Sequence, residues 1–326
     1  KCLDYYSEYF GIDYPLDKCD MIALPDFASG AMENWGAITY REQALLVDPD
    51  NTSLSTKQYV AMVVAHELTH QWFGNLVTMQ WWTDLWLNEG FATWFEYLAV
   101  DHIYPKWKMW TQFAVDEQQQ ALKLDALEHT HPVQVTVNHP DEIRTIFDSI
   151  SYSKGASVIH MLYHYLGAKD FQTGLRYYLK KHSYKNTTTH DLWDALEEAS
   201  EKPVRSFMHA WTTQSGYPIV HVEAKELSLS ITQERFYLNP LSKHVDKNVW
   251  PVPLLSDLDA LPDTLETSSE KYYDIQSDSS KLNVGGSGFY RTTYNATHLQ
   301  HLATKIKKGQ LDPLDRLGIL ADMTEA

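Results

Sequence analysis

The sequence has few of the residues that mark several protein classes. Its 326 residues include only two cysteines, Cys2 and Cys19, which are too few for a disulfide framework. The two thiols are compatible with one bridge and equally with a reduced pair. The longest apolar run is Tyr59–Ala65, far shorter than the roughly 18 residues of a membrane span. We therefore expect no membrane span in this chain.

Basic residues are also scarce relative to acidic ones. The chain has 27 Lys and Arg against 43 Asp and Glu, a net charge of −16 at pH 7. A nucleic-acid-binding protein needs a basic face to displace counterions, so this class is excluded. Apolar residues make up 44% and aromatic residues 13% of the chain, which excludes a disordered protein and suffices for a sizeable core.

The pattern of apolar residues changes near residue 216. Before this point the apolar spacing is mostly helical, and after it short β-favouring runs are broken by Pro and Gly. Helical spacing returns from Thr297 onward. These changes predict three parts, which are a mainly helical domain over 1–216, a small β-sandwich over 217–294 and the start of a helical domain over 295–326.

The same spacing predicts individual elements. We expect helices over about 55–74, 85–104, 106–125, 142–147, 154–166, 170–182, 189–200 and 203–214. We expect strands over 21–24, 37–40, 45–47, 219–222, 227–232, 272–275 and 289–294. Ser55 and Gln58 predict an N-terminal capping box for the first long helix. Lys1–Phe10 resembles an amphipathic helix inside a domain and not a signal peptide, so we expect a fragment of a longer protein.

The strongest chemical signal is His66-Glu67-Leu68-Thr69-His70. Two histidines at i and i+4 share one face of a helix, so both imidazoles can bind one zinc ion. Glu67 is offset by about 100° around the helix and can act as a general base instead of a ligand. A chance match on a solvated helix face is the alternative, but His66 and His70 lie in an apolar stretch where buried imidazoles need partners.

A catalytic zinc site needs a third protein ligand and an open position. Glu89 is the candidate, because the intervening loop can turn the chain back so that two helices face one ion. Thr93 and Glu96 follow on the same helix face and could each orient a ligand. They could equally form a polar edge packed against Trp94 and Phe95, and the sequence leaves both readings open.

A further motif, Gly30-Ala31-Met32-Glu33-Asn34, precedes the zinc motif. By residue chemistry alone it is equally a turn before a strand. Together with His66-Glu67-x-x-His70 and Glu89, however, it resembles the zinc aminopeptidases of the aminopeptidase N family, which are gluzincins. The likeness is greatest to the puromycin-sensitive aminopeptidase branch. Further resemblance runs through Ile150–Val158, Ala210–Thr212, Gly216–Pro218, Gly288–Arg291 and Asp315–Leu317.

The resemblance implies roles for residues that the sequence alone does not single out. Enzymes of this family remove single residues from peptide N-termini with one zinc ion per active site. Glu33 is expected to pair with the substrate's α-ammonium group, and Tyr152 to stabilise the oxyanion. Gly30 and Ala31, with Met32 and Asn34, are expected to bind substrate backbone by edge pairing. Glu67 is expected to take a proton from the water that zinc activates and to pass it to the leaving amine.

The resemblance also implies an α+β fold with a thermolysin-like catalytic domain containing a small mixed sheet. The family's N-terminal domain and most of its C-terminal domain have no counterpart here, so they are expected partners from the parent protein. Peptides with a free N-terminus are the expected substrates. A cytoplasmic location is expected from the nearest branch and the sparse cysteines, although membrane-anchored and secreted relatives exist.

Two alternatives remain open at this stage. The chain could bind zinc but be inactive as a peptidase, because the missing domains supply substrate-binding groups. It could also be an endopeptidase or a leukotriene-hydrolase-like zinc hydrolase. An endopeptidase would cleave N-acetylated peptides, and leukotriene-type relatives usually carry Gly-Gly where this chain has Gly30-Ala31.

Overall fold

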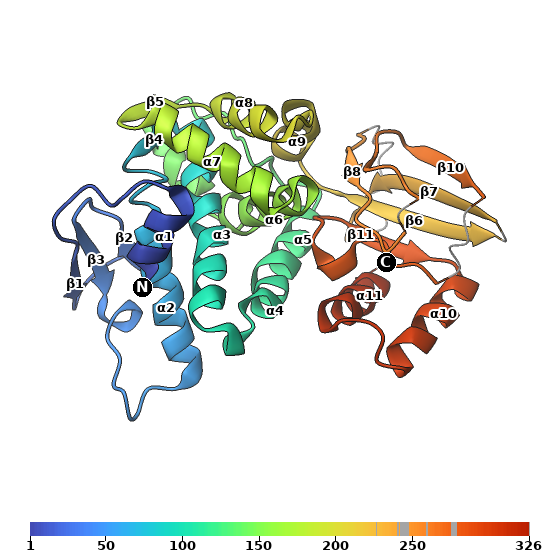
Figure 1. The fold of residues 1–326 in the computed structure, drawn as a ribbon, viewed down its shortest axis with the longest axis horizontal. Coiled ribbons are helices and arrows are strands. Elements are labelled where there is room, and N and C mark those ends of the chain that lie inside the picture. Colours follow the sequence, from blue (N-terminus) through green and yellow to red (C-terminus); the bar gives the residue numbers. More distant parts are fainter. Residues whose placement is uncertain (226, 240, 242–247, 259, 275–278, 326) are drawn as a thin grey trace. The chain divides into compact units, whose positions relative to one another are not determined.

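The computed structural model describes the chain except residues 226, 240, 242–247, 259, 275–278 and 326. Figure 1 labels its helices and strands. The chain divides into two compact units that are interleaved along the sequence. The first unit contains residues 1–113, 136–147 and 168–205, and the second contains 114–135, 148–167 and 206–326. The three predicted parts therefore stay a prediction. None of the helices in the described residues has both the length and the apolarity that a membrane crossing requires.

The first unit is mainly helical with two small sheets. Its helices are α1 Cys2–Phe10, α2 Leu54–Thr69, α3 Trp86–Ile103, α4 Met109–Phe113, α7 Ala168–His182 and α8 Thr189–Ser200. Its strands are β1 Asp20–Leu24, β2 Ala31–Met32, β3 Ala37–Arg41, β4 Val77–Met79 and β5 Lys185–Thr187. The helices predicted over 85–104, 170–182 and 189–200 are confirmed within two residues at each end. The helix predicted over 55–74 ends at Thr69, the one over 106–125 is divided by a π-helical turn at Ala114–Gln118, and the one over 142–147 is a 3₁₀ helix, Pro140–Ile146. Strands β4 and β5 were not predicted.

The three-stranded sheet is mixed, as expected. Its order is β1-β3-β2, with β1 parallel and β2 antiparallel to β3, so β2 lies at an edge. The prediction of a strand over 45–47 is wrong, because a 3₁₀ turn at Glu42–Ala44 ends the strand-forming stretch. Leu46 is 56% and Val47 is 46% exposed, so this apolar run does not mark a buried strand.

Helix α2 begins two residues earlier than the capping pattern predicted. Ser53, not Ser55, is the N-cap, and its hydroxyl accepts a hydrogen bond from Thr56 N at 3.1 Å. The Ser55–Gln58 capping box is therefore wrong, because Ser55 already lies inside the helix. Helix α2 packs directly against α3, which is buried along almost its whole length.

Helix α1 is fixed to this pair by one buried phenol. Tyr6 is fully buried, and its hydroxyl lies 3.0 Å from the carbonyl of Ala65 in α2 and 3.1 Å from that of Phe95 in α3. A phenol needs a polar partner when it is buried, and here it bonds two helices. Tyr6 therefore helps to fix the spacing between α2 and α3.

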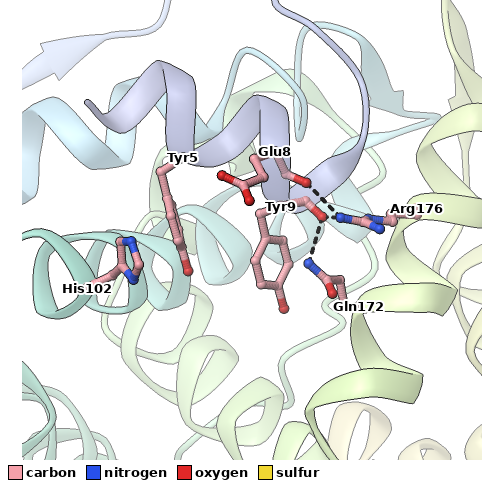
Figure 2. Close-up of a pocket in the computed structure, with 6 residues that line it drawn as sticks. All are labelled: Tyr5, Glu8, Tyr9, His102, Gln172 and Arg176. Atoms are coloured by element: carbon pink, nitrogen blue, oxygen red, sulfur yellow. Dashed lines mark hydrogen bonds between the residues drawn. The ribbon is translucent and has the colours of Figure 1, made fainter.

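The other end of α1 is capped by side chains of α7. Arg176 donates from Nη2 to Glu8 O at 2.7 Å and from Nε to Tyr9 O at 2.8 Å, and Gln172 donates to Tyr9 O at 3.0 Å (Figure 2). Carbonyls at a helix C-terminus lack intrahelical donors and favour a cation. Tyr5 and His102 complete the lining of a hollow of about 280 Å³ at this place.

The second unit combines helices with a four-stranded sheet. Its helices are α5 Gln119–Asp125, α6 Gly155–Leu166, α9 Val204–Thr213, which begins at the unit boundary, α10 Ala296–Lys307 and α11 Pro313–Glu325. Its strands are β6 Pro218–Lys225, β7 Ser228–Arg235, β8 Val252–Pro253, β9 Thr264–Leu265, β10 Ser269–Tyr273 and β11 Arg291–Tyr294. The sheet order is β10-β7-β6-β11, and β8 pairs with β9 separately. The expected strand over 272–275 extends into residues outside the described part.

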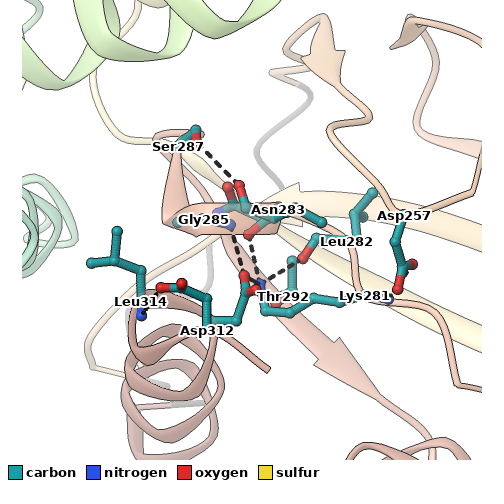
Figure 3. Close-up of polar contacts among 12 residues, drawn as sticks. Asp257, Lys281, Leu282, Asn283, Gly285, Ser287, Thr292, Asp312 and Leu314 are labelled. Carbon is teal, nitrogen blue, oxygen red and sulfur yellow. Dashed lines mark hydrogen bonds and ion pairs between the residues drawn. The ribbon is translucent and has the colours of Figure 1, made fainter. Parts of the chain in front are cut away.

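Helix α11 is held to β11 by a buried ion pair. Arg291 Nη1 lies 3.2 Å from Asp322 Oδ1, and Asp322 Oδ2 accepts from Thr292 N at 2.8 Å. Asp312 starts the helix by accepting a hydrogen bond from Leu314 N at 3.2 Å, as Figure 3 shows. Nearby, Lys281 Nζ donates to Asn283 O at 2.6 Å. These contacts are those of a structural network, because each buried charge has a partner.

We predict that Tyr6→Phe destabilises the first unit by about 1 kcal/mol, because a buried hydrogen bond contributes roughly that amount. Thermal or denaturant unfolding measures the change. Tyr184→Phe is the matched control, because Tyr184 is 70% exposed, and we expect it to have little effect. Equal stability of the Tyr6→Phe variant and the unsubstituted chain would contradict this account of the helix spacing.

Candidate metal centre and functional site

Two histidines of α2 and one glutamate of α3 converge in the first unit. His66 Nε2 lies 3.4 Å and His70 Nε2 lies 3.5 Å from Glu89 Oε2. One ligand atom from each of the three residues lies within 4.8 Å of the others. The sequence-predicted ligands are therefore brought together. Two imidazoles and one carboxylate form a donor set that suits a catalytic zinc ion.

The local structure explains why these three side chains meet. His66 lies in the last turn of α2, and His70 is its C-cap residue with right-handed helical backbone angles. The i, i+4 relation therefore persists to the end of the helix, and the two rings lie 4.8 Å apart. Glu89 lies in the first turn of α3, where the helix dipole favours a carboxylate.

The far nitrogen of each imidazole is also held. His66 Nδ1 lies 2.9 Å from Glu96 Oε2, and His70 Nδ1 lies 3.0 Å from Phe73 O. Such contacts fix the ring orientation, with Nε2 of each ring towards Glu89, where it can bind a metal. Glu96 thus contacts a candidate ligand. No side-chain hydrogen bond joins Thr93 to a ligand among the residues that the structure describes, so Thr93 fits the alternative of a buried polar edge.

Glu67 lies beside the three candidate ligands but is not one of them. It is only 6% exposed, and among the described residues its Oε2 has no hydrogen-bond partner. A buried carboxylate oxygen without a partner is costly unless a ligand, a metal or a water satisfies it. The donor set and this unpaired oxygen together fit a metal centre with a base next to it.

The buried charges of the site shift one another's pKa values. Burial raises the pKa of Glu67 to about 7. The two histidines act to lower this pKa, and the charge of Glu33 acts to raise it. Burial alone would raise the pKa of Glu89, but His70 and His66 outweigh it and hold this pKa well below its ordinary value. Burial opposes protonation of His70, but Glu89 outweighs it and raises the pKa to about 9.

The Gly30–Asn34 segment lies beside the same site. Its Ala31 and Met32 form edge strand β2, and the Asn34 amide ties the turn by donating to Thr39 Oγ1 at 3.2 Å. A Cβ added to Gly30 would meet only the Tyr59 hydroxyl, at 3.9 Å, so the backbone here is open to approach. The Glu33 charge raises the pKa values of both Glu67 and His70, and the Glu33 carbonyl is bonded by Gln71, the residue that directly follows His70.

Tyr152 belongs to the second unit, so its role stays a prediction. It lies in a π-helical turn, Ile150–Lys154, whose neighbours are firmly held. Asp148 accepts from Ile150 N at 3.0 Å and lies 2.7 Å from His131 Nε2. At the other end Lys154 forms an ion pair of 2.7 Å with Asp125, in which both side chains are fully buried.

Sequence reasoning missed two residues that bond to Glu33. Gln71 and Asn75 both donate side-chain hydrogen bonds to the Glu33 carbonyl, at 3.3 Å and 2.8 Å. Gly74-Asn75 looked only like the end of a helix. Gln71 directly follows His70, and Asn75 lies five positions after it, both beyond the end of α2 at Thr69. Their closeness in sequence to a candidate ligand was the available signal.

Comparisons with known proteins agree with the resemblance inferred from the motifs. Residues 1–211 match the sequence profile described as the peptidase family M1 domain. The chain is 49% identical to aminopeptidase M1 of Arabidopsis thaliana, across 99% of this chain and 38% of that protein. It is 44% identical to the puromycin-sensitive aminopeptidase of Caenorhabditis elegans, across 99% of this chain and 35% of that protein. The chain is also 44% identical to the tricorn protease-interacting factor F2 of Thermoplasma volcanium, across 99% of this chain and 40% of that protein. The chain thus spans about two fifths of the length of these relatives.

We predict that Glu96→Gln weakens zinc binding about 10- to 100-fold, because outer contacts of this kind orient and polarise a ligand. Titration with zinc in a competing chelator measures the affinity. Thr93→Val is the matched control one turn earlier on α3, and we expect it to retain the affinity. A Glu96→Gln variant that binds zinc as tightly as the unsubstituted chain would contradict a role for Glu96 in orienting the metal ligand His66.

Proposed function

The chain belongs to peptidase family M1, and from this membership and the geometry of the site we propose that it is a zinc-dependent aminopeptidase. The observation that supports the proposal most strongly is the convergence of His66, His70 and Glu89 beside the unpaired carboxylate oxygen of Glu67. His66, His70 and Glu89 would hold one zinc ion per chain. The ion supplies Lewis acidity, which lowers the pKa of a water and polarises the substrate carbonyl.

The residues around the ion divide the remaining work. Glu67 accepts a proton from the attacking water and delivers it to the nitrogen of the leaving amine. Glu96 holds the His66 ring and the Phe73 carbonyl holds the His70 ring, each through Nδ1. The orientation of both rings is therefore set before substrate binds. Tyr152 donates its phenolic hydrogen to the oxyanion that develops on the former carbonyl oxygen.

Glu33 gives the proposed reaction its preference for chain ends. Its carboxylate pairs with the α-ammonium group of the substrate, and this contact fits only when the scissile bond is the first one. Edge strand β2 offers backbone groups at Ala31 and Met32 for pairing with an extended peptide. The proposed substrates are therefore peptides with a free N-terminus. The cytoplasmic location is kept as part of this proposal.

A second candidate is a zinc-binding chain that does not turn over substrate. The observation that favours it is that the chain covers only 38% of the Arabidopsis relative, so groups outside this sequence could complete the substrate site. Endopeptidase activity has less support, because an ammonium-binding carboxylate beside the metal would hinder an internal peptide segment from binding.

We predict that the purified chain binds one zinc ion and cleaves an unblocked aminoacyl amide but not its N-acetylated counterpart. Elemental analysis and a rate assay on both substrates are made on the same preparation. Zinc with cleavage of neither substrate would favour the second candidate. Cleavage of the acetylated substrate at a similar rate would favour an endopeptidase, and absence of zinc from a folded chain would contradict the metal centre.

We predict that Glu67→Gln retains zinc and loses about 10²- to 10⁴-fold in kcat, because the ligands are unchanged and a general base is lost. Zinc content and single-turnover rates measure the two effects. Glu42→Gln, at an exposed glutamate of the same unit, is the control and should be fully active. Retained turnover in Glu67→Gln would exclude this residue as the base.

A further inference from the structure

The carbonyl group of Glu33 is held by two amide side chains that follow the metal-binding helix. Asn75 Nδ2 lies 2.8 Å and Gln71 Nε2 lies 3.3 Å from Glu33 O. Gln71 Nε2 also lies 2.9 Å from Glu67 O, so one amide group bonds to the backbone of both residues. We call these two bonds to Glu33 O the carbonyl clamp.

The clamp is part of the same backbone that carries the candidate metal ligands. Gln71 directly follows His70 and is 1% exposed, so its amide has little freedom. The backbone N–H of Asn75 donates to His70 O at 2.9 Å, which fixes Asn75 relative to this ligand. Any shift of Glu33 away from His70 must therefore break a part-buried hydrogen bond.

Strand pairing alone does not fix Glu33 in this way. The pairing of β2 with β3 covers only Ala31 and Met32, and Glu33 lies just beyond it. Asn34 is tied to Ala37 N and to Thr39, but these bonds do not involve the Glu33 carbonyl, which is bonded by Gln71 and Asn75. The side chain of Glu33 is attached to the Cα that is bonded to this carbonyl carbon. The clamp therefore limits where the Glu33 carboxylate can lie.

We propose that Gln71 and Asn75 are positioning residues for substrate-amine recognition. They hold the Glu33 backbone so that its carboxylate is placed for an ammonium group at a set distance from the metal ligands. The inference rests on the proposed function, because it assumes that Glu33 binds the α-amine. Neither residue touches the substrate. They act by reducing the reorganisation that Glu33 would otherwise undergo when the amine binds.

A binding measurement tests this without requiring turnover. The probes are an amino-acid hydroxamate with a free amine and its N-acetylated counterpart, titrated into the zinc-loaded chain by calorimetry. The ratio of their Kd values is the amine preference. We expect Asn75→Ala to lower this preference about two- to tenfold, which corresponds to one hydrogen bond, with the zinc content and the affinity for the acetylated probe unchanged.

Asn186→Ala is the matched control. Its Nδ2 lies 3.3 Å from Met79 O, so the variant also removes an amide-to-carbonyl bond from the first unit, but at the β4–β5 pair. It should keep the full amine preference. Gln71→Met keeps a side chain of similar length without the donor and should lower the preference like Asn75→Ala. If Asn75→Ala does not fold, the amine preference of Gln71→Met tests the proposal in its place.

A double-mutant cycle with Glu33→Gln separates positioning from a general loss of stability. If Asn75 acts through Glu33, the Asn75→Ala change has no further effect on amine preference once Glu33 is replaced. Additive losses would overturn the proposal, and so would an unchanged preference in Asn75→Ala. An unsubstituted chain that binds both probes equally would instead contradict the amine site itself, which is the failure of the proposed function and not of the clamp alone.

Discussion

The packing of α2 against α3 is the constraint on which the candidate site depends. His66 and His70 belong to one helix and Glu89 to the other, so the separation of the helices sets the size of the ligand cluster. Metal–ligand distances tolerate changes of only about 0.2 Å. The aromatic core supplies the needed rigidity, with Phe73 stacked on Phe91 at 4.6 Å between ring centroids. Tyr6 adds hydrogen bonds to both helices from a third one.

Burial gives this helix pair its chemistry. Glu67, Glu89, Glu96 and His70 are all less than 10% exposed, and ionised groups are rarely buried without partners. Most of these charges are paired with one another, and the exception is the second oxygen of Glu67. A site with buried ligands and one unpaired carboxylate oxygen suits a proton-transfer group beside a cation. The same residues would destabilise the fold if their partners were removed singly.

The sequence predicted best where one motif combined chemistry with periodicity. The i, i+4 spacing of His66 and His70 requires only a helix. The stop signal at Gly74-Asn75 was less accurate, because α2 already ends at Thr69. Prediction failed where local patterns had several outcomes. The apolar run 45–47 looked like a strand but is exposed, and Ser55 looked like a cap although Ser53 takes that position. The choice between Thr93 and Glu96 depended on which side chain faces His66, and helical spacing cannot decide this.

By itself the sequence determined the donor types, their order and the helices that carry them, because these follow from residue identity and from contacts a few positions apart. Only the tertiary structure decided that Glu89 meets both histidines, that Glu96 bonds to His66, and that Gln71 and Asn75 hold the Glu33 carbonyl. Each of these contacts joins residues on different elements, and Glu33 and Asn75 are 42 positions apart. Their geometry is set by how the core packs, which no local pattern in the chain encodes.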